Sequence, residues 1–132
     1  MSDLGLTHIA LSVSSLPRSI AFWTKYAQLQ KVHEHPGVVW LSDKLRPFAI
    51  VLIELPDQNV PLLPENHIGV AVKSRAELDR LAGEARKENC LLRGPEDAGP
   101  IVGYWVYIKD PDGHTLELSH GQEVGLAVQN TE

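Results

Sequence analysis

The chain contains one short strand pattern twice, and this repeat limits the possible folds more than any other feature. Residues 6–13 read LTHIALSV and residues 65–72 read ENHIGVAV, so that His8 and His67 align at an offset of 59 residues. Apolar runs of this length predict strands that are buried on at least one face. An internal repeat predicts two copies of one supersecondary unit, neither of which can bury its apolar face alone.

A helix is expected after each of these strands. In SSLPRSIAFWTKYAQL, a serine precedes Pro17 in the first turn, and apolar residues follow at helical spacing. In SRAELDRLAGEARKENC, Ser74 and Glu77 form the S-x-x-E pattern of a capping box. Both halves therefore continue from strand to helix at the same point of the repeat.

Three further strands are expected after each helix. The sequence DPDG at 110–113 predicts a hairpin turn between the last two strands of the second half. Each half then reads βαβββ, and we predict an α+β fold in which two paired βαβββ modules form a concave sheet cup. The expected organisation is a single domain over 1–132, with modules at 1–60 and 64–122 joined by a segment rich in proline and asparagine.

Each half places a histidine on its first strand and a glutamate on its last strand. The first half supplies His8 and Glu54, and the second supplies His67 and Glu117. Because side chains alternate along a strand, we expect all four on the concave face, beside small residues that leave room for a ligand. Two imidazoles and two carboxylates suit a divalent first-row metal ion, with Ni, Zn, Co, Mn and Fe as the candidates.

Charge and composition exclude several classes of partner. The net charge is −5 and no run of Lys or Arg exceeds two residues, which argues against nucleic acid. No apolar run is long enough to span a membrane, and the N-terminus lacks the pattern of a signal peptide. The single cysteine, Cys90, fits a reducing compartment. We expect a cytoplasmic protein that binds a small molecule, and a homodimer because each half leaves surface to cover.

Three segments together resemble the vicinal oxygen chelate superfamily: HIALSVSSLPRSIAFWTKYAQL, HIGVAV and YIKDPDGHTLEL. This group contains glyoxalase I, methylmalonyl-CoA epimerase, extradiol dioxygenases, fosfomycin-resistance enzymes and the metal-free bleomycin-resistance proteins. The resemblance implies a site built from paired βαβββ modules, and it places the metal ligands at His8, Glu54, His67 and Glu117. Pairing within one chain and swapping between two chains both remain open.

The resemblance favours a lyase or isomerase of the glyoxalase I type, because Glu54 supplies the fourth ligand. Glu117 or Glu54 would then act as the general base in a metal-assisted proton transfer. Ser12 and Gln58 replace the arginine and asparagine that glyoxalase I commonly has there, which speaks against glutathione as the substrate.

Two alternatives stay open beside this activity. An Fe(II) or Mn(II) extradiol-type dioxygenase acting on a catechol would use His8, His67 and Glu117, with Tyr107 as the catalytic acid-base partner. A metal-free, ligand-sequestering protein would instead line its pocket with Trp40 and Trp105.

Three further histidines are expected outside the metal site. His33 and His35 alternate in VHEHPG and therefore share one strand face, where we expect them to be exposed to solvent. His114 follows the DPDG turn and is expected at the surface.

Overall fold

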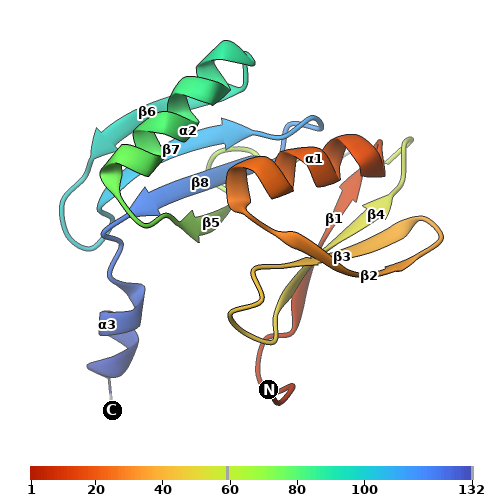
Figure 1. Cartoon of the computed structure of the whole chain (residues 1–132), viewed down its shortest axis with the longest axis horizontal. Coiled ribbons are helices and arrows are strands. Elements are labelled where there is room, and N and C mark those ends of the chain that lie inside the picture. Colours follow the sequence, from red (N-terminus) through yellow and green to blue (C-terminus); the bar gives the residue numbers. More distant parts are fainter. Residues whose placement is uncertain (59, 132) are drawn as a thin grey trace. The chain divides into compact units, whose positions relative to one another are not determined.

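The computed structural model describes residues 1–58 and 60–131 and divides them into two compact units (Figure 1). The first unit comprises Met1–Pro61 together with the short segment Asp110–Gly113. The second comprises Leu62–Lys109 and the chain from His114 onward. Each unit is described below by itself.

The first unit is a four-stranded sheet with one helix. Its strand order is β1-β4-β3-β2, with β1 parallel to β4 and the other neighbours antiparallel. The elements, in chain order, are β1 (His8–Val13), α1 (Leu16–Ala27), β2 (Gln30–His35), β3 (Val38–Ser42) and β4 (Ala49–Glu54).

The second unit repeats this order as β5-β8-β7-β6, with β5 parallel to β8. Its elements are β5 (His67–Ala71), α2 (Arg75–Lys87), β6 (Leu91–Asp97), β7 (Tyr104–Lys109), β8 (Thr115–His120) and the short α3 (Val124–Gln129). The predicted α+β class and the βαβββ order of both halves are confirmed. No helix in the described part of the chain is long and apolar enough to cross a lipid bilayer.

Both long helices begin at serine N-caps. The Ser15 hydroxyl accepts from the Arg18 N–H at 3.4 Å, and the Ser74 hydroxyl accepts from the Glu77 N–H at 3.0 Å. These bonds satisfy one of the free N–H groups at each helix start. The second half of the predicted capping box does not form, because the Glu77 carboxylate pairs with Arg80 at 2.6 Å instead of returning to the cap.

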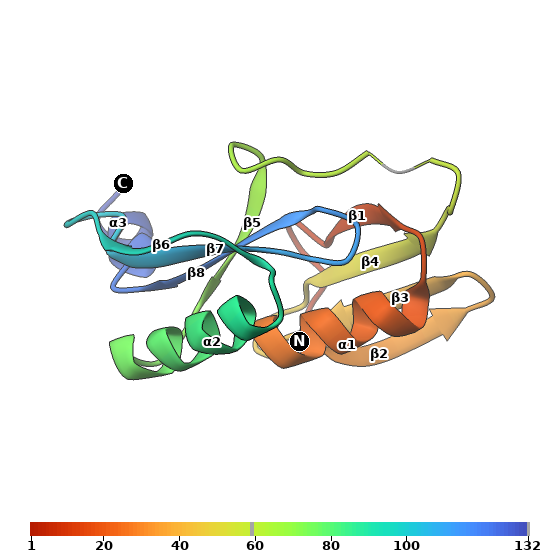
Figure 2. The same cartoon turned by 90° about the horizontal axis from the view of Figure 1, so that it is seen from above.

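Each helix packs on one face of its own sheet. In the first unit, Trp23 of α1 and Leu52 of β4 are both 0% exposed. In the second, Leu78 of α2 and Leu118 of β8 are equally buried. Figure 2 shows α1 running along one side of its sheet and α2 along one side of β6–β8. The opposite face of each sheet, on which the long helix of its unit does not pack, is called its open face.

The DPDG segment forms the predicted turn between β7 and β8, and its residues belong to the first unit. The Trp23 indole donates from Nε1 to Asp110 Oδ2 at 3.2 Å, and the Ser14 N–H lies 3.1 Å from both carboxylate oxygens of Asp112. Both aspartates are largely buried, which is affordable because they receive these donors. The first unit is therefore discontinuous in sequence.

Candidate active site

The open face of the second unit carries a row of four residues, one from each strand. Gly69 pairs with Glu117, Glu117 with Tyr107, and Tyr107 with Arg93. Residues paired in this way point to the same side of a sheet, so the row lies on one face. His67 stands two residues before Gly69 on β5 and shares that face.

Glu117 is a buried carboxylate beside His67. It is 5% exposed, and a Cβ added at Gly69 would lie 3.5 Å from its Oε2 atom, so the glycine keeps open the space next to the carboxylate. Burial raises the pKa of Glu117, and the nearby His67 acts in the opposite direction. No hydrogen bond to this carboxylate is formed by residues 1–58 or 60–131. His67 is therefore the group of this face that interacts with the Glu117 carboxylate.

The ring of His67 is held with one nitrogen free. Its Nδ1 lies 2.7 Å from the Pro64 carbonyl oxygen. Since a carbonyl can only accept, Nδ1 must carry the hydrogen, and in the neutral ring Nε2 keeps its lone pair. A backbone carbonyl that fixes the tautomer in this way is the usual support of a metal-binding histidine.

Tyr107 joins His67 and Glu117 on this face. Its ring centroid is 5.0 Å from that of His67 and 4.6 Å from that of Trp105, and the Arg93 guanidinium lies 5.5 Å from it. Burial raises the pKa of Tyr107, the charges of Glu117 and Glu65 raise it further, and Arg93 lowers it. The phenol is therefore neutral at pH 7 and can donate a proton or a hydrogen bond.

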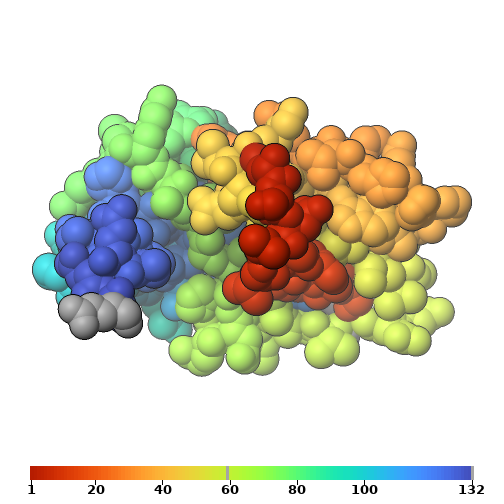
Figure 3. Space-filling view, turned by 90° about the horizontal axis from the view of Figure 1, so that it is seen from below, coloured from red at the N-terminus to blue at the C-terminus, as the bar shows by residue number. Residues whose placement is uncertain are grey.

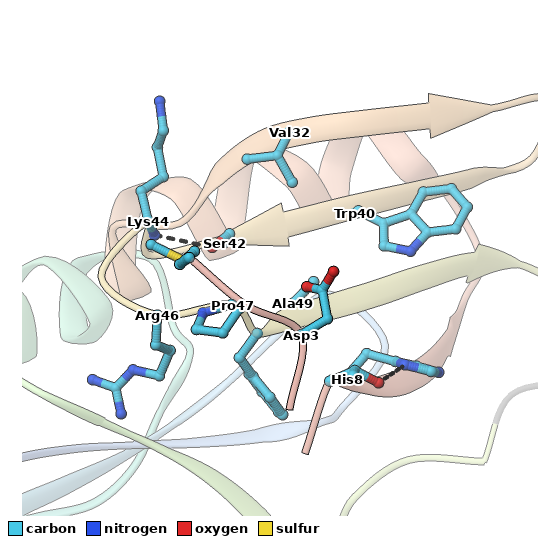
Figure 4. Close-up of a pocket in the computed structure, with 12 residues that line it drawn as sticks. Asp3, His8, Val32, Trp40, Ser42, Lys44, Arg46, Pro47 and Ala49 are labelled. Carbon is cyan, nitrogen blue, oxygen red and sulfur yellow. Dashed lines mark hydrogen bonds between the residues drawn. The ribbon is translucent and has the colours of Figure 1, made fainter. Parts of the chain in front are cut away.

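The first unit contains a pocket of about 550 Å³ on its open face, and His8 is part of its wall (Figure 4). His8 Nδ1 lies 2.9 Å from the Thr7 hydroxyl, which can accept its hydrogen and leave Nε2 free. Figure 3 shows the N-terminal segment (red) lying over this face of the first unit. The lining residues are Met1, Asp3, Thr7, His8, Val32, Trp40, Ser42, Lys44, Arg46, Pro47, Phe48 and Ala49.

The prediction that Glu54 shares the face of His8 is wrong. In the parallel pair of β1 and β4, His8 is opposite Ala49, and Glu54 is opposite Val13, whose side chain is in the core. Glu54 therefore projects on the helix side, where its Oε2 accepts from the Leu16 N–H at 3.0 Å. A carboxylate is stabilised there by the free N–H groups and the dipole of α1. Glu54 is thus removed from the predicted set of ligands and bases.

The register shows which residue takes the place of Glu117 in the first unit. Val51 lies opposite Ala10, two residues after His8, as Glu117 lies opposite Gly69, two residues after His67. The sequence alignment of Glu54 with Glu117 missed this, because it matched residue types and not strand pairing. The two buried leucines, Leu52 and Leu118, follow Val51 and Glu117 directly, and aligning these leucines gives the correct correspondence between the two halves.

The structure therefore brings together three of the predicted site residues, His67, Glu117 and Tyr107, on the open face of the second unit. His8 and Glu54 lie on opposite faces of the first. Neither unit by itself gathers three His, Cys, Asp or Glu side chains within the described residues. His114 is also corrected: it is 1% exposed and accepts from the Leu62 N–H at 2.9 Å, so its role is structural.

Taken unit by unit, the open faces carry side chains of the types that a divalent metal ion accepts, His8 in the first unit and His67 with Glu117 in the second. They are imidazole nitrogens and carboxylate oxygens, and no thiolate stands among these residues. This mixture of nitrogen and oxygen suits Mn, Fe, Co, Ni or Zn.

A family model matches residues 5–118, which include both histidines and Glu117. The chain belongs to the Glyoxalase/Bleomycin resistance protein/Dioxygenase superfamily. Its relative in Pseudomonas aeruginosa, Uncharacterized protein PA2024, is 33% identical over 127 residues, which is 91% of each chain. The superfamily that the sequence motifs resemble is thereby confirmed.

Solved structures of this superfamily share the fold at low identity. The fosfomycin resistance protein FosX from Listeria monocytogenes, complexed with Mn(II) and sulfate, has a TM-score of 0.74 at 19% identity over 98% of this chain and 100% of that one. A possible glyoxalase from Bacillus cereus has a TM-score of 0.69 at 22% identity over 89% of this chain and 99% of that one. Lactoylglutathione lyase from Agrobacterium tumefaciens has a TM-score of 0.64 at 20% identity over 95% of this chain and 99% of that one.

Proposed function

We propose that this superfamily member is a divalent-metal enzyme acting on a small substrate that presents two neighbouring oxygen atoms. His8, His67 and Glu117 are the proposed ligands. The observation that carries the proposal is the pairing of a largely buried carboxylate with a histidine whose Nδ1–H is already bound to a carbonyl. Such an ion would supply Lewis-acid chemistry when bound. The Mn(II) in FosX, which has the same fold, supports a metal of this class.

The reaction that we propose is a proton transfer of the lyase or isomerase type. Burial raises the pKa of the Glu117 carboxyl, which would make it a stronger base than a surface glutamate when it is not bound to the ion. Tyr107 keeps its proton at neutral pH and can donate a hydrogen bond to a substrate oxygen. Arg93 adds positive charge beside Tyr107 and favours an anionic group on the substrate. We do not extend the proposal to glutathione, since Ser12 and Gln58 depart from the residues that glyoxalase I commonly has there.

A second candidate is an extradiol-type dioxygenase acting on a catechol. Two observations favour it: Glu54 projects to the helix side, which leaves two histidines and one carboxylate, and Tyr107 stands directly opposite Glu117. Two histidines and a carboxylate are typical of the iron site of non-haem oxygenases. Tyr107 would then be the acid-base group that serves the hydroxyls of the catechol.

Elemental analysis tests the metal. The full chain is purified without chelator and without a metal-affinity tag, and its tightly held metal is measured beside the His67→Ala and His8→Ala variants. We expect one such ion per chain, lost in both variants. If the wild-type protein neither contains nor takes up metal, the enzymatic proposal fails and the metal-free, ligand-sequestering alternative takes its place.

Two assays then separate the reactions. Isomerisation of hemithioacetals and related hydroxycarbonyl compounds supports the proton transfer, whereas oxygen uptake with a panel of catechols supports the dioxygenase. The Tyr107→Phe variant adds a second readout, since loss of its hydroxyl should depress the dioxygenase reaction more than a proton transfer based on Glu117.

Mixing variants shows how many copies of the chain supply one site. Inactive His8→Ala and Glu117→Gln proteins are unfolded together, refolded and assayed. Recovery of activity means that His8 and Glu117 of one site come from two copies, as in the homodimer that we propose. The absence of recovery means that one chain supplies all the ligands.

A further inference from the structure

A second pair of histidines lies at the far edge of the open face of the first unit. His33 and His35 alternate on β2, and His33 pairs with Trp40 of β3. Their Nε2 atoms are 3.3 Å apart, and their rings meet edge to face at 4.7 Å. Both side chains are exposed, so an ion can reach them from solvent.

The separation of these nitrogens matches that of two ligands on one metal ion. Histidine nitrogen binds zinc at about 2.0–2.1 Å, and tetrahedral angles then place two such nitrogens about 3.3–3.4 Å apart. The two histidines have this spacing in the structure. The rings need only present both lone pairs, which requires the hydrogen of each neutral imidazole to lie on Nδ1.

We propose that His33 and His35 form a chelating site for a first-row divalent cation, separate from the candidate active site. His8 lies on β1, three strands across the sheet, which is about 14 Å at the usual spacing of strands. Among the described residues no third His, Cys, Asp or Glu joins the pair, so water completes the coordination. By the usual order of affinities, the site prefers Cu²⁺ to Ni²⁺ and Zn²⁺.

An ion at this site would act on the pocket through Trp40. The indole lies 5.0 Å from the His33 ring and 5.6 Å from the His35 ring, and it also lines the pocket that contains His8 (Figure 4). Chelation fixes both imidazoles, and these rings pack directly against the indole. The site therefore stiffens one wall of the pocket without touching the proposed ligands.

Trp40 also provides the readout for a test. Fluorescence of the full chain, stripped of metal, is titrated with Ni²⁺, an open-shell ion that quenches nearby indoles. The Trp105→Phe variant serves as the background, because Trp105 lies 4.6 Å from Tyr107 and would report metal at the candidate active site. In this background we expect saturable quenching. The His33→Gln or His35→Gln change should weaken it by at least about tenfold, because the second nitrogen then no longer binds intramolecularly.

Two further variants make the result specific. Glu34→Gln alters the residue between the histidines, which points to the opposite face, and should leave the quenching unchanged. His67→Ala removes a ligand of the candidate active site and should also leave it unchanged, so that this site and the proposed function can fail separately. Absence of quenching, or equal quenching in the His33→Gln variant, would mean a hydrogen-bonded histidine pair only and would overturn the proposal.

Discussion

The two sheets have the same strand order and differ in what their open faces carry. Across the second sheet the row is Gly69, Glu117, Tyr107 and Arg93, and across the first the equivalent row is Ala10, Val51, Trp40 and His33. Only the histidine at the start of the first strand is common to both faces. Both halves therefore have the same scaffold. Glu117, Tyr107 and Arg93 stand in the second half, and the described pocket lies in the first. Strand pairing, and not residue type, shows which positions correspond.

The strongest test of this comparison concerns the two glutamates. Glu117→Gln should lower activity by about 10²–10⁴-fold, because it removes the proposed base and ligand from a buried position. Glu54→Gln should keep both activity and bound metal, since its amide oxygen can still accept from the Leu16 N–H. The readouts are turnover and metal content, with circular dichroism as the check on folding. Equal losses of turnover and bound metal in the two variants would mean that Glu54 belongs to the site.

The cores of the two units should respond alike. Leu52 and Leu118 occupy equivalent positions and are both 0% exposed. Replacing either by alanine should lower the free energy of unfolding by about 2–5 kcal/mol, from lost burial and the cavity that remains. Urea unfolding of the two variants measures this. If one substitution costs almost nothing, the equivalence drawn from strand pairing does not extend to packing.

The helix caps should differ by a smaller amount. Ser74→Ala should cost about 1 kcal/mol, the usual value for an N-cap serine. Ser15→Ala should cost less, because its bond to Arg18 is longer and Glu54 still accepts from the first turn of α1. Adding Glu54→Ala to Ser15→Ala should then cost about 0.3–1 kcal/mol more. Thermal unfolding of the three proteins measures these costs, and equal stability of the double variant and Ser15→Ala would mean that Glu54 has no capping role.

The smallest expected effect is a shift in the titration of one tyrosine. Tyr104 of β7 donates its hydroxyl hydrogen to Asp79 of α2, and this bond raises the pKa of the phenol. Because the folded-state pKa is the higher one, the stabilisation is complete below the unfolded value of about 10 and is lost as the pH rises through the folded value. Ultraviolet titration should show Asp79→Asn lowering this pKa. An unchanged titration curve would mean that the bond to Asp79 does not persist in solution.

Much of the fold followed from the sequence because it depends on local patterns. The repeat predicted both βαβββ halves, the serines predicted the helix starts, and DPDG predicted the turn. The alternation of residues also placed His67 and Glu117 correctly on one face.

The errors arose where long-range packing decides. The register of β4 against β1 is set by burial of Leu52 and by the length of the preceding loop. The local sequence LIEL predicts neither of them. A shift of register by an odd number of residues moves a side chain to the other face, which is what separated Glu54 from His8. His114 was expected at the surface because it follows a turn, yet the chain near Leu62 covers it.

The discontinuity of the first unit has a consequence for how the chain is made. Trp23 and Ser14 bind acceptors that lie 87 and 98 residues further along. During synthesis the N-terminal half therefore leaves the ribosome before Asp110 and Asp112 have been translated. Its hydrogen bonds from Trp23 and Ser14 can form only after these two residues follow. A gene truncated between the two halves would encode the strands and helix of the first unit without the two carboxylates that bind Trp23 and Ser14.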